Sequence, residues 1–237
     1  MFKLQTKFLD LSDIRIAYCE NGSGTSIILL HGNSGSKSIF KQYQNRYLDN
    51  FHTYALDSRG HGESVSIDSK YTINQYSDDV IGFCERLGIK KAYVIGYSDG
   101  GNISLFLAKK RPDIFERIIA VSPNYLVSGT TDNSMKLIRR FISIFKILKK
   151  LGINTTKMIM RFDLMLNDIG ISDDDLKSIH TNMSILYAQN DMIKEDHILS
   201  IGEMIPNSII EKINNCTHLN IMRNENTISS IKRFFSR

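Results

Sequence analysis

The stretch YVIGYSDGGNISL, residues 93–105, decides how the chain is organised. It passes from an apolar, strand-like run through Gly96-Tyr97-Ser98-Asp99-Gly100 into a helix-like run. Glycines flanking a serine in this way let a strand turn sharply into a helix and lift the serine hydroxyl into the open. A serine at the start of a helix is also a common capping residue. Alone, the stretch predicts a strand–turn–helix unit and leaves the role of Ser98 open.

Strand-like and helix-like segments alternate along most of the chain. Apolar runs typical of strands lie at 2–11, 14–20, 26–30, 53–56, 92–96, 117–122, 183–188 and 208–213. Runs with helical periodicity lie near 37–48, 72–87, 99–110, 194–204 and 224–235. The first strands read as antiparallel, and the β–α alternation after them predicts an α/β fold with a mostly parallel central sheet and helices on both faces.

Residues 124–181 break this alternation with two or three helical stretches. Because they fall between two blocks of β–α alternation, we expect them to form a small helical cap, or lid, over the functional edge of the sheet. Residues 1–123 and 182–237 then form the core. A chain of 237 residues suits one domain that carries such an insertion.

The net charge of +5 is concentrated in one segment. Between residues 130 and 161, eight lysines and arginines accompany the single acid Asp132. A basic segment without a binding motif does not indicate nucleic acid. Within it, MKLIRRFISIFKILKKL, residues 135–151, predicts an amphipathic helix. We expect its apolar side to cover a pocket; docking on an anionic membrane is the alternative, and we do not expect membrane association.

The cellular location follows from three features of the sequence. The N-terminal residues MFKLQTKFLDLSD alternate like a strand and lack the apolar region of a signal peptide. No apolar run approaches the ~18 residues that span a bilayer. Cys19, Cys84 and Cys216 are widely spaced and odd in number, which is typical of neither a disulfide framework nor a zinc site. We therefore expect a cytoplasmic protein.

A serine nucleophile needs a base, and the base needs an acid to orient it. Asp191 directly follows one late strand, and His218 follows the next. The order Ser98, Asp191, His218 is the one used by α/β-hydrolases and differs from the order in chymotrypsin or subtilisin. We predict that these three side chains form a catalytic triad; the structural alternative for Asp191 is a helix cap.

The tetrahedral intermediate of acyl transfer also needs backbone N–H donors for its oxyanion. One donor is expected next to the nucleophile, and the other in the loop after an early strand. That loop is LLHGNSGS, residues 29–36. The N–H groups of Asn33 and Asp99 are therefore our candidates for the oxyanion hole.

Five motifs in family order resemble the α/β-hydrolase superfamily: HGNSGS, DSRGHGES, GYSDGG, AQND and NCTHLN. They are spread over residues 25–122 and 182–225. The resemblance implies a Ser98–His218–Asp191 triad, with His31 and the DSRGHGES loop mainly structural. The Ser-Asp-Gly-Gly sequence is similar to that of the biphenyl-hydrolase-like esterases, which include valacyclovir hydrolases. The chain departs from the family pattern in the residues before His218 and in the cap, so the substrate stays open.

Asp99 and Tyr125 are the candidate substrate-binding residues. The carboxylate of Asp99 would stand beside the nucleophile and could attract a substrate ammonium. An acid in the first turn of a helix is also favoured by the helix dipole without any ligand. Tyr125, Phe141 and Met160 belong to the expected cap and are candidates to line the pocket.

Together these features predict a serine hydrolase that cleaves a small carboxylic ester, such as an amino-acid ester or a related acyl compound, through an acyl-enzyme on Ser98. An acyltransferase, a lactonase and a C–C bond hydrolase are alternatives on the same scaffold, and a non-catalytic small-ligand receptor is a further one. Neither phosphate-loop nor metal-ligand spacing is present, so we expect no cofactor and no metal. The expected partner is a small-molecule ester and not nucleic acid, and we make no prediction of oligomeric state.

Overall fold

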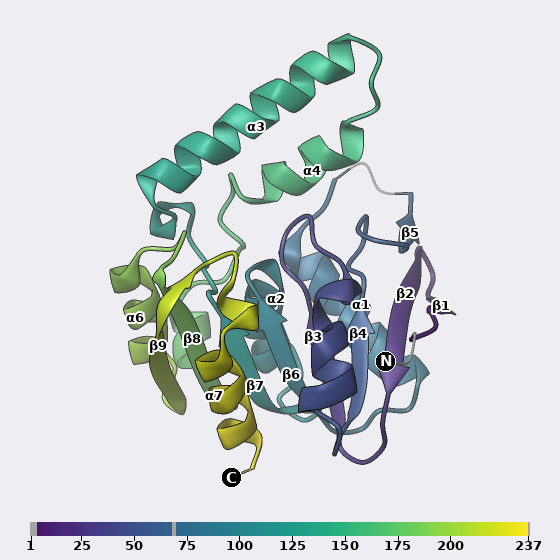
Figure 1. Cartoon of the computed structure of the whole chain (residues 1–237), viewed down its shortest axis with the longest axis vertical. Coiled ribbons are helices and arrows are strands. Elements are labelled where there is room, and N and C mark those ends of the chain that lie inside the picture. The colour runs from purple at the N-terminus through teal and green to yellow at the C-terminus, as the bar shows by residue number, and fades with distance from the viewer. Residues whose placement is uncertain (1–3, 68–69, 237) are drawn as a thin grey trace.

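The computed structural model describes residues 4–67 and 70–236 and contains a nine-stranded sheet (Figure 1). The strands are β1 (Lys7–Asp10), β2 (Ile14–Asn21), β3 (Ser26–Leu30), β4 (His52–Leu56), β5 (Val65–Ser66), β6 (Ala92–Tyr97), β7 (Phe115–Val121), β8 (Asn182–Asn190) and β9 (Ser208–Thr217). Their spatial order is β1-β2-β4-β3-β6-β7-β8-β9, with β5 paired to β2. The pairs formed by β2 are antiparallel, and every pair from β4 through β9 is parallel. The predicted mostly parallel α/β sheet is confirmed.

The described residues form seven α-helices, five of which pack on the sheet. They are α1 (Ile73–Arg86), α2 (Asp99–Lys110), α3 (Asp132–Lys150), α4 (Thr156–Leu164), α5 (Asp173–Lys177), α6 (Glu195–Met204) and α7 (Glu225–Phe235). The segment expected as a helix near 37–48 is instead a 3-10 turn at Lys37–Phe40 followed by a π-type turn at Tyr43–Tyr47. Two further 3-10 turns lie at Val127–Gly129 and Ile221–Arg223.

The central strands are apolar on both faces because each face has its own core. Ile28 and Val94 belong to the cluster that packs beneath α1, α2, α5 and α6. Their neighbours Ile27 and Ile95 point to the other face, where they join the turns near residue 40 and helix α7. A strand buried on both faces reads as a continuous apolar run, which is why SIILL lacks an alternating pattern.

Helices α3 and α4 stand away from the sheet as a helical hairpin, residues 132–164 (Figure 1). The third helix of the expected cap behaves differently. Leu176 of α5 is fully buried in the core cluster, and Asp175 forms an ion pair with Lys109 of α2. The protruding part of residues 124–181 is therefore the hairpin, and α5 is packed on the core. No helix within the described residues is long and apolar enough to cross a membrane.

Candidate active site

Ser98 lies in the sharp turn between β6 and α2. Its φ of 55° is in the left-handed region, which costs a non-glycine residue roughly 1–3 kcal/mol. The glycines on either side are needed for close packing. A side chain at Gly96 would collide with the carbonyl of Gly100, and one at Gly100 would collide with the carbonyl of Leu30. The turn therefore has the strained strand–turn–helix geometry that the sequence predicts.

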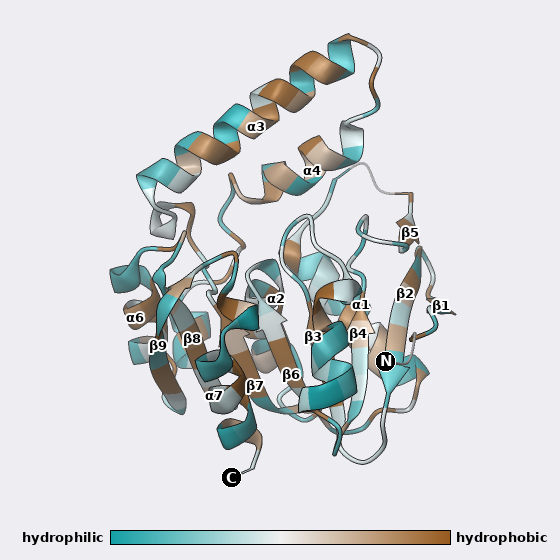
Figure 2. Cartoon of the chain, viewed as in Figure 1, coloured by the Kyte–Doolittle hydropathy of each residue, from teal (hydrophilic) through white to brown (hydrophobic). Residues whose placement is uncertain are grey.

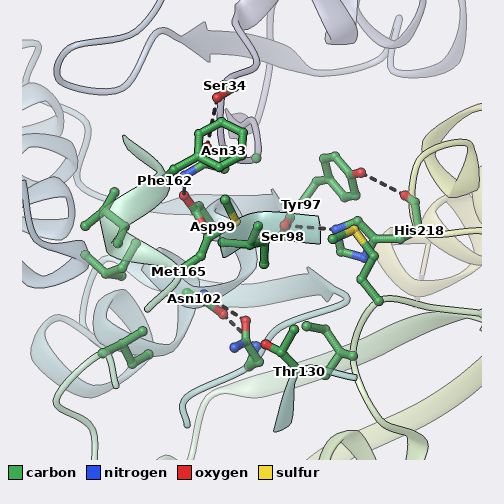
Figure 3. A pocket seen from close by; sticks show the side chains of 18 of the residues that line it. Asn33, Ser34, Tyr97, Ser98, Asp99, Asn102, Thr130, Phe162, Met165 and His218 are labelled. Atoms are coloured by element: carbon green, nitrogen blue, oxygen red, sulfur yellow. Dashed lines mark hydrogen bonds between the residues drawn. The ribbon is translucent and has the colours of Figure 1, made fainter. Parts of the chain in front are cut away.

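The three predicted triad residues form one chain of hydrogen bonds, and the Ser98–His218 bond is drawn in Figure 3. Ser98 Oγ lies 3.0 Å from His218 Nε2, and His218 Nδ1 lies 2.6 Å from Asp191 Oδ1. With the imidazole proton on Nδ1, His218 donates to Asp191 and its Nε2 is free to accept the serine proton. This is the arrangement that a general base requires.

The carboxylate of Asp191 is held by four donors. Besides His218, its Oδ1 accepts the N–H of Ile193 at 3.1 Å. Its Oδ2 accepts the hydroxyl of Ser122 at 2.6 Å and the N–H of Ala188 at 2.9 Å. Burial opposes ionisation, but the bonds from His218, Ser122 and Ala188 outweigh it and hold the pKa of Asp191 below its ordinary value. The acid is therefore ionised and fixed in orientation.

Ser122 is a contributor that the sequence reasoning missed. It follows β7, is almost completely buried, and has a φ of 52°. Its N–H is bonded to the carbonyl of Leu186, which places its hydroxyl against Asp191. The available signal was its position at the end of a strand next to β8, but nothing in the run RIIAVS distinguishes it from an ordinary strand-end serine.

The loop after β3 packs directly against the nucleophile. A side chain at Gly32 would come within 2.8 Å of Ser98 Cβ, and Asn33 Nδ2 donates to Asp99 Oδ2 at 3.0 Å. Within the described residues, the backbone N–H groups of Asn33 and Asp99 make no hydrogen bond to the protein. Both predicted oxyanion donors are thus near the nucleophile and available to a ligand.

A neutral histidine supports this loop from behind. His61 Nε2 accepts the N–H of Ser34, whose φ of 56° is in the left-handed region. Burial lowers the pKa of His61 to about 3, so the imidazole stays neutral and keeps its acceptor. His31, which burial likewise gives a lowered pKa, accepts the N–H of Ser58. The structural role implied for His31 and the DSRGHGES loop agrees with these contacts.

Helix α4 is tied to the same loop. Asn33 Nδ2 donates to the carbonyl oxygen of Arg161 at 2.7 Å, and the guanidinium of Arg161 donates to the carbonyl of Gly60. The side chain of Asn33 therefore bridges the hairpin and Asp99, the residue after the nucleophile. In this way the hairpin contacts the loop that carries one candidate oxyanion donor.

The triad opens into a cavity of about 370 Å³ between the sheet edge and the hairpin (Figure 3). One part of its wall is polar and includes Asn33, Asp99, Asn102 and Asn124. Most of the remainder is apolar and comes from the hairpin, the loop after it and the strand ends; it includes Leu137, Ile138, Phe141, Phe162, Leu164, Met165, Ile169, Met192, Ile193 and Leu219. The volume suits a small molecule with an apolar portion.

Tyr125 does not line this cavity, so its predicted contact with substrate is not supported. Its ring stacks on His197 at 4.9 Å between centroids, and its hydroxyl donates to Asp173. The residue braces the base of the cap segment. Of the other two cap candidates, Phe141 lines the cavity and Met160 lines a neighbouring crevice.

Asp99 lies in the wall of the cavity and is nearly buried. Burial raises its pKa to about 6, although the hydrogen bond from Asn33 and the nearby His218 act in the opposite direction. Its carboxyl group therefore titrates close to neutral pH. No group of three or more His, Cys, Asp or Glu side chains in the described part of the chain is arranged to hold a metal ion.

A family model for the α/β hydrolase fold matches residues 25–152, more than half of the chain. The chain belongs to the α/β-hydrolase family. The match covers β3 to the end of α3 and so contains Ser98 and both candidate oxyanion donors.

This α/β hydrolase is similar in sequence to a curated hydrolase and similar in fold to two solved structures. It is 33% identical over 113 residues to 2-(acetamidomethylene)succinate hydrolase of Mesorhizobium japonicum, which covers 48% of the chain and 41% of that relative. The chain thus matches less than half the length of that relative. The fold superposes on the meta-cleavage product hydrolase CumD of Pseudomonas fluorescens IP01 with a TM-score of 0.77, 20% identity and 94% coverage of both chains. It also superposes on a thermophilic esterase from Thermogutta terrifontis with a TM-score of 0.76, 20% identity and 98% coverage of both chains.

Proposed function

We propose that this α/β hydrolase is a serine hydrolase that cleaves a small carboxylic ester through an acyl-enzyme on Ser98. The observation that carries the proposal is the unbroken hydrogen-bond chain from Asp191 through His218 to Ser98, at the wall of a cavity large enough for a small molecule. A nucleophile, a base and an orienting acid in this geometry are what acyl transfer requires.

In the proposed reaction, Ser98 Oγ attacks the substrate carbonyl carbon while its proton passes to His218 Nε2. The N–H groups of Asn33 and Asp99 stabilise the oxyanion that forms. His218 then gives the proton to the leaving alcohol, and the acyl group remains on Ser98 as an ester. A water molecule that loses a proton to His218 attacks this ester, which releases the acid and restores the serine. Asp191 stabilises the imidazolium in both halves of the reaction.

The ester is our choice among several acyl compounds. The esterase likeness and the apolar wall support it. The likeness to a meta-cleavage product hydrolase makes C–C bond cleavage the second candidate, since the same serine can attack a ketone carbonyl. We further propose that residues 124–181 act as the cap that selects the substrate, through Phe141 and Phe162 in the cavity wall.

Labelling with a fluorophosphonate, read as intact mass, tests the nucleophile. We expect one adduct on the wild type and none on Ser98→Ala, with turnover of short p-nitrophenyl esters lower by about 10⁴–10⁶-fold in the variant. Ser104→Ala is the matched control, because Ser104 is a buried serine of α2 whose hydroxyl donates to the Gly100 carbonyl and does not line the cavity. It should keep both the adduct and the turnover.

Two outcomes would change the proposal. The absence of an adduct on folded wild-type protein would refute a serine nucleophile and favour a small-ligand receptor. An adduct without ester turnover would keep Ser98 as the nucleophile and favour C–C bond cleavage, a lactone or an acyl acceptor other than water.

We also propose that Asp99 favours substrates with an α-amino group. Its carboxyl group lies in the cavity wall next to Ser98, where an ammonium could pair with it. A charge-assisted hydrogen bond of this kind is worth about 1.5–3 kcal/mol, or roughly 10- to 150-fold in kcat/KM. Because the pKa of Asp99 is raised to about 6, its negative charge, and with it the preference, should grow as the pH rises through 6.

The measurement is the ratio of kcat/KM for an α-amino ester and its des-amino analogue at pH 5 and 7.5. Asp99→Asn keeps the size of the side chain and a group that can face Asn33, but removes the charge. We expect a ratio above one that increases with pH in the wild type and falls toward one in the variant. Equal turnover of the two esters by the wild type would exclude amine recognition.

A further inference from the structure

The apolar side of α3 is only partly covered by the rest of the molecule. Ile138 and Ile142 are buried beneath the helix, while Leu137 and Phe141 line the cavity. The sequence led us to expect that the whole apolar side would cover the pocket. The structure confines this role to the first half of the helix. In the second half, Phe145 packs on Phe162 of α4 with 5.3 Å between ring centroids, while Ile144 and Ile147 remain exposed.

The end of the hairpin exposes several large apolar side chains. Ile147 is 58% exposed, Leu151 is 72% exposed and Ile153 is 52% exposed. Ile144, one turn earlier, is 40% exposed. We call residues 144–157 the hairpin tip. Figure 2 shows apolar and polar residues alternating along α3 up to this end, well away from the sheet.

The same tip carries only positive charge. Its sequence, IFKILKKLGINTTK, contains the four lysines 146, 149, 150 and 157 and no acid. None of these lysines forms an ion pair with any described residue, and all four are exposed. Arg139 and Arg140 extend the positive charge along α3 and also lack an ionic partner there. Both the apolar and the charged groups of the tip are therefore available to something outside the chain.

The sequence led us to expect no membrane association, but the exposed groups of the tip favour the alternative, and we infer that the hairpin tip docks on the surface of an anionic lipid bilayer. Exposed aliphatic side chains on a helix with a basic face are the pattern that binds at the boundary between headgroups and acyl chains. Ile147, Leu151 and Ile153 enter this boundary, and the surrounding lysines pair with the lipid phosphates. Such docking needs no membrane-spanning helix. It goes beyond the proposed esterase function and does not depend on it.

The charge of the tip favours an anionic bilayer over a second copy of the chain, and its apolar side chains favour a bilayer over a nucleic acid. A second copy would bring another tip with four lysines and no acid, so tip-to-tip contact is repulsive. A nucleic acid would satisfy the lysines but leave the isoleucines and Leu151 in water. An anionic bilayer satisfies both sets of groups.

Docking would also orient the active site. Residues 137, 141, 144, 148 and 151 recur at helical spacing and form one apolar stripe along α3. The stripe begins at the cavity wall and ends in the tip. A hairpin held on a bilayer would therefore place one wall of the cavity in continuity with the lipid boundary.

Co-sedimentation with vesicles tests the inference. The full chain carrying Ser98→Ala is used, so that hydrolysis cannot alter the lipids and the result is independent of the proposed activity. At low ionic strength we expect binding to vesicles that mix phosphatidylglycerol with phosphatidylcholine, weak binding to phosphatidylcholine alone, and release by added salt. Each lysine near such a surface contributes roughly fivefold in affinity.

Two matched pairs of variants separate the tip from the rest of the surface. Lys149→Gln with Lys150→Gln should weaken binding roughly 10- to 30-fold, whereas Lys41→Gln with Lys90→Gln, which changes the net charge equally on exposed residues outside the hairpin, should not.

The second pair tests the apolar contribution. Ile153→Ser should weaken binding by about tenfold, and Ile209→Ser, a residue of similar exposure on β9, should leave it unchanged.

Several results would overturn the inference. One is the absence of binding to anionic vesicles at low salt. Another is equal loss of binding in the tip variants and their controls, which would indicate general charge attraction. A third is concentration-dependent self-association that the tip variants abolish, without vesicle binding, which would assign the tip to a second copy.

Discussion

At the scale of single residues, the acid of the triad depends on a partner outside the triad. Ser122 donates a 2.6 Å hydrogen bond to Asp191 although its backbone is held at a φ of 52°. Left-handed backbone at a non-glycine residue persists only where its surroundings impose it. The orientation of the Ser122 hydroxyl is thus maintained at an energetic cost, which we interpret as a positioning role for Ser122.

Replacing Ser122 separates this role from the backbone strain. Ser122→Gly and Ser122→Ala both remove the hydroxyl, but glycine relieves the strained φ and alanine does not. We expect kcat/KM to fall about tenfold in both variants, since a lost bond to a charged group costs ~1.5–3 kcal/mol. The bond from Ser122 is one of those that lower the pKa of Asp191, so its loss should raise that pKa, and kcat/KM at acid pH should fall further below its value at neutral pH than in the wild type.

Comparing the stability and the activity of the two variants shows whether Ser122 positions Asp191 or serves only the fold. Unfolding in denaturant should show Ser122→Gly to be at least as stable as Ser122→Ala. A glycine variant with the wild-type rate and pH profile would mean that Ser122 serves only the fold.

At the scale of elements, the sequence predicted the strands and helices that have a repeating hydrophobic pattern, and missed the turns and contacts that have none. The strand runs and most helices were recognisable because burial on one or two faces imposes a period. The segment near 37–48 was not, because its turns pack by Phe40 and Tyr43 rather than by a helical stripe. The packing of α5 on the core could not be predicted, because nothing in DDDLK reveals that Leu176 inserts there. The contacts of Tyr125 with His197 and Asp173 were equally unpredictable, because no pattern in the sequence around Tyr125 indicates them.

The contacts between α4 and the catalytic loops are of a kind that periodicity cannot predict. Asn33 meets Arg161 across 128 residues of sequence, and Arg161 meets Gly60 across 101. Ser122 meets Asp191 across 69 residues. The meeting of Ser98, His218 and Asp191 was predictable, because each of them follows a strand and parallel strands bring their ends to one edge. Its supporting contacts are single side-chain bonds with no repeating signal.

At the scale of the whole molecule, the buried neutral histidines His31 and His61, which support the loops near Ser98, make the free energy of unfolding depend on pH. The pKa of His61 falls from about 6.5 to about 3 on folding because of burial, and that of His31 is lowered for the same reason. Between pH 6.5 and 3 the unfolded chain therefore binds a proton that folded His61 does not. The contribution of neutral His61 to the free energy of unfolding is fully present above pH 6.5 and decreases as the pH falls toward 3.

Denaturant unfolding at pH 7 and 5 measures this linkage. For His61 alone, the free energy of unfolding should drop by about 2 kcal/mol between the two pH values. In His61→Gln that part of the drop should vanish, although the variant starts from a lower stability because the bond to the Ser34 N–H is altered. The exposed His180 provides the control, and His180→Gln should keep the wild-type pH dependence. A loss of stability in His61→Gln as large as that of the wild type between pH 7 and 5 would mean that the fold does not hold His61 neutral. The Ser34 loop would then be supported by contacts other than the bond to His61.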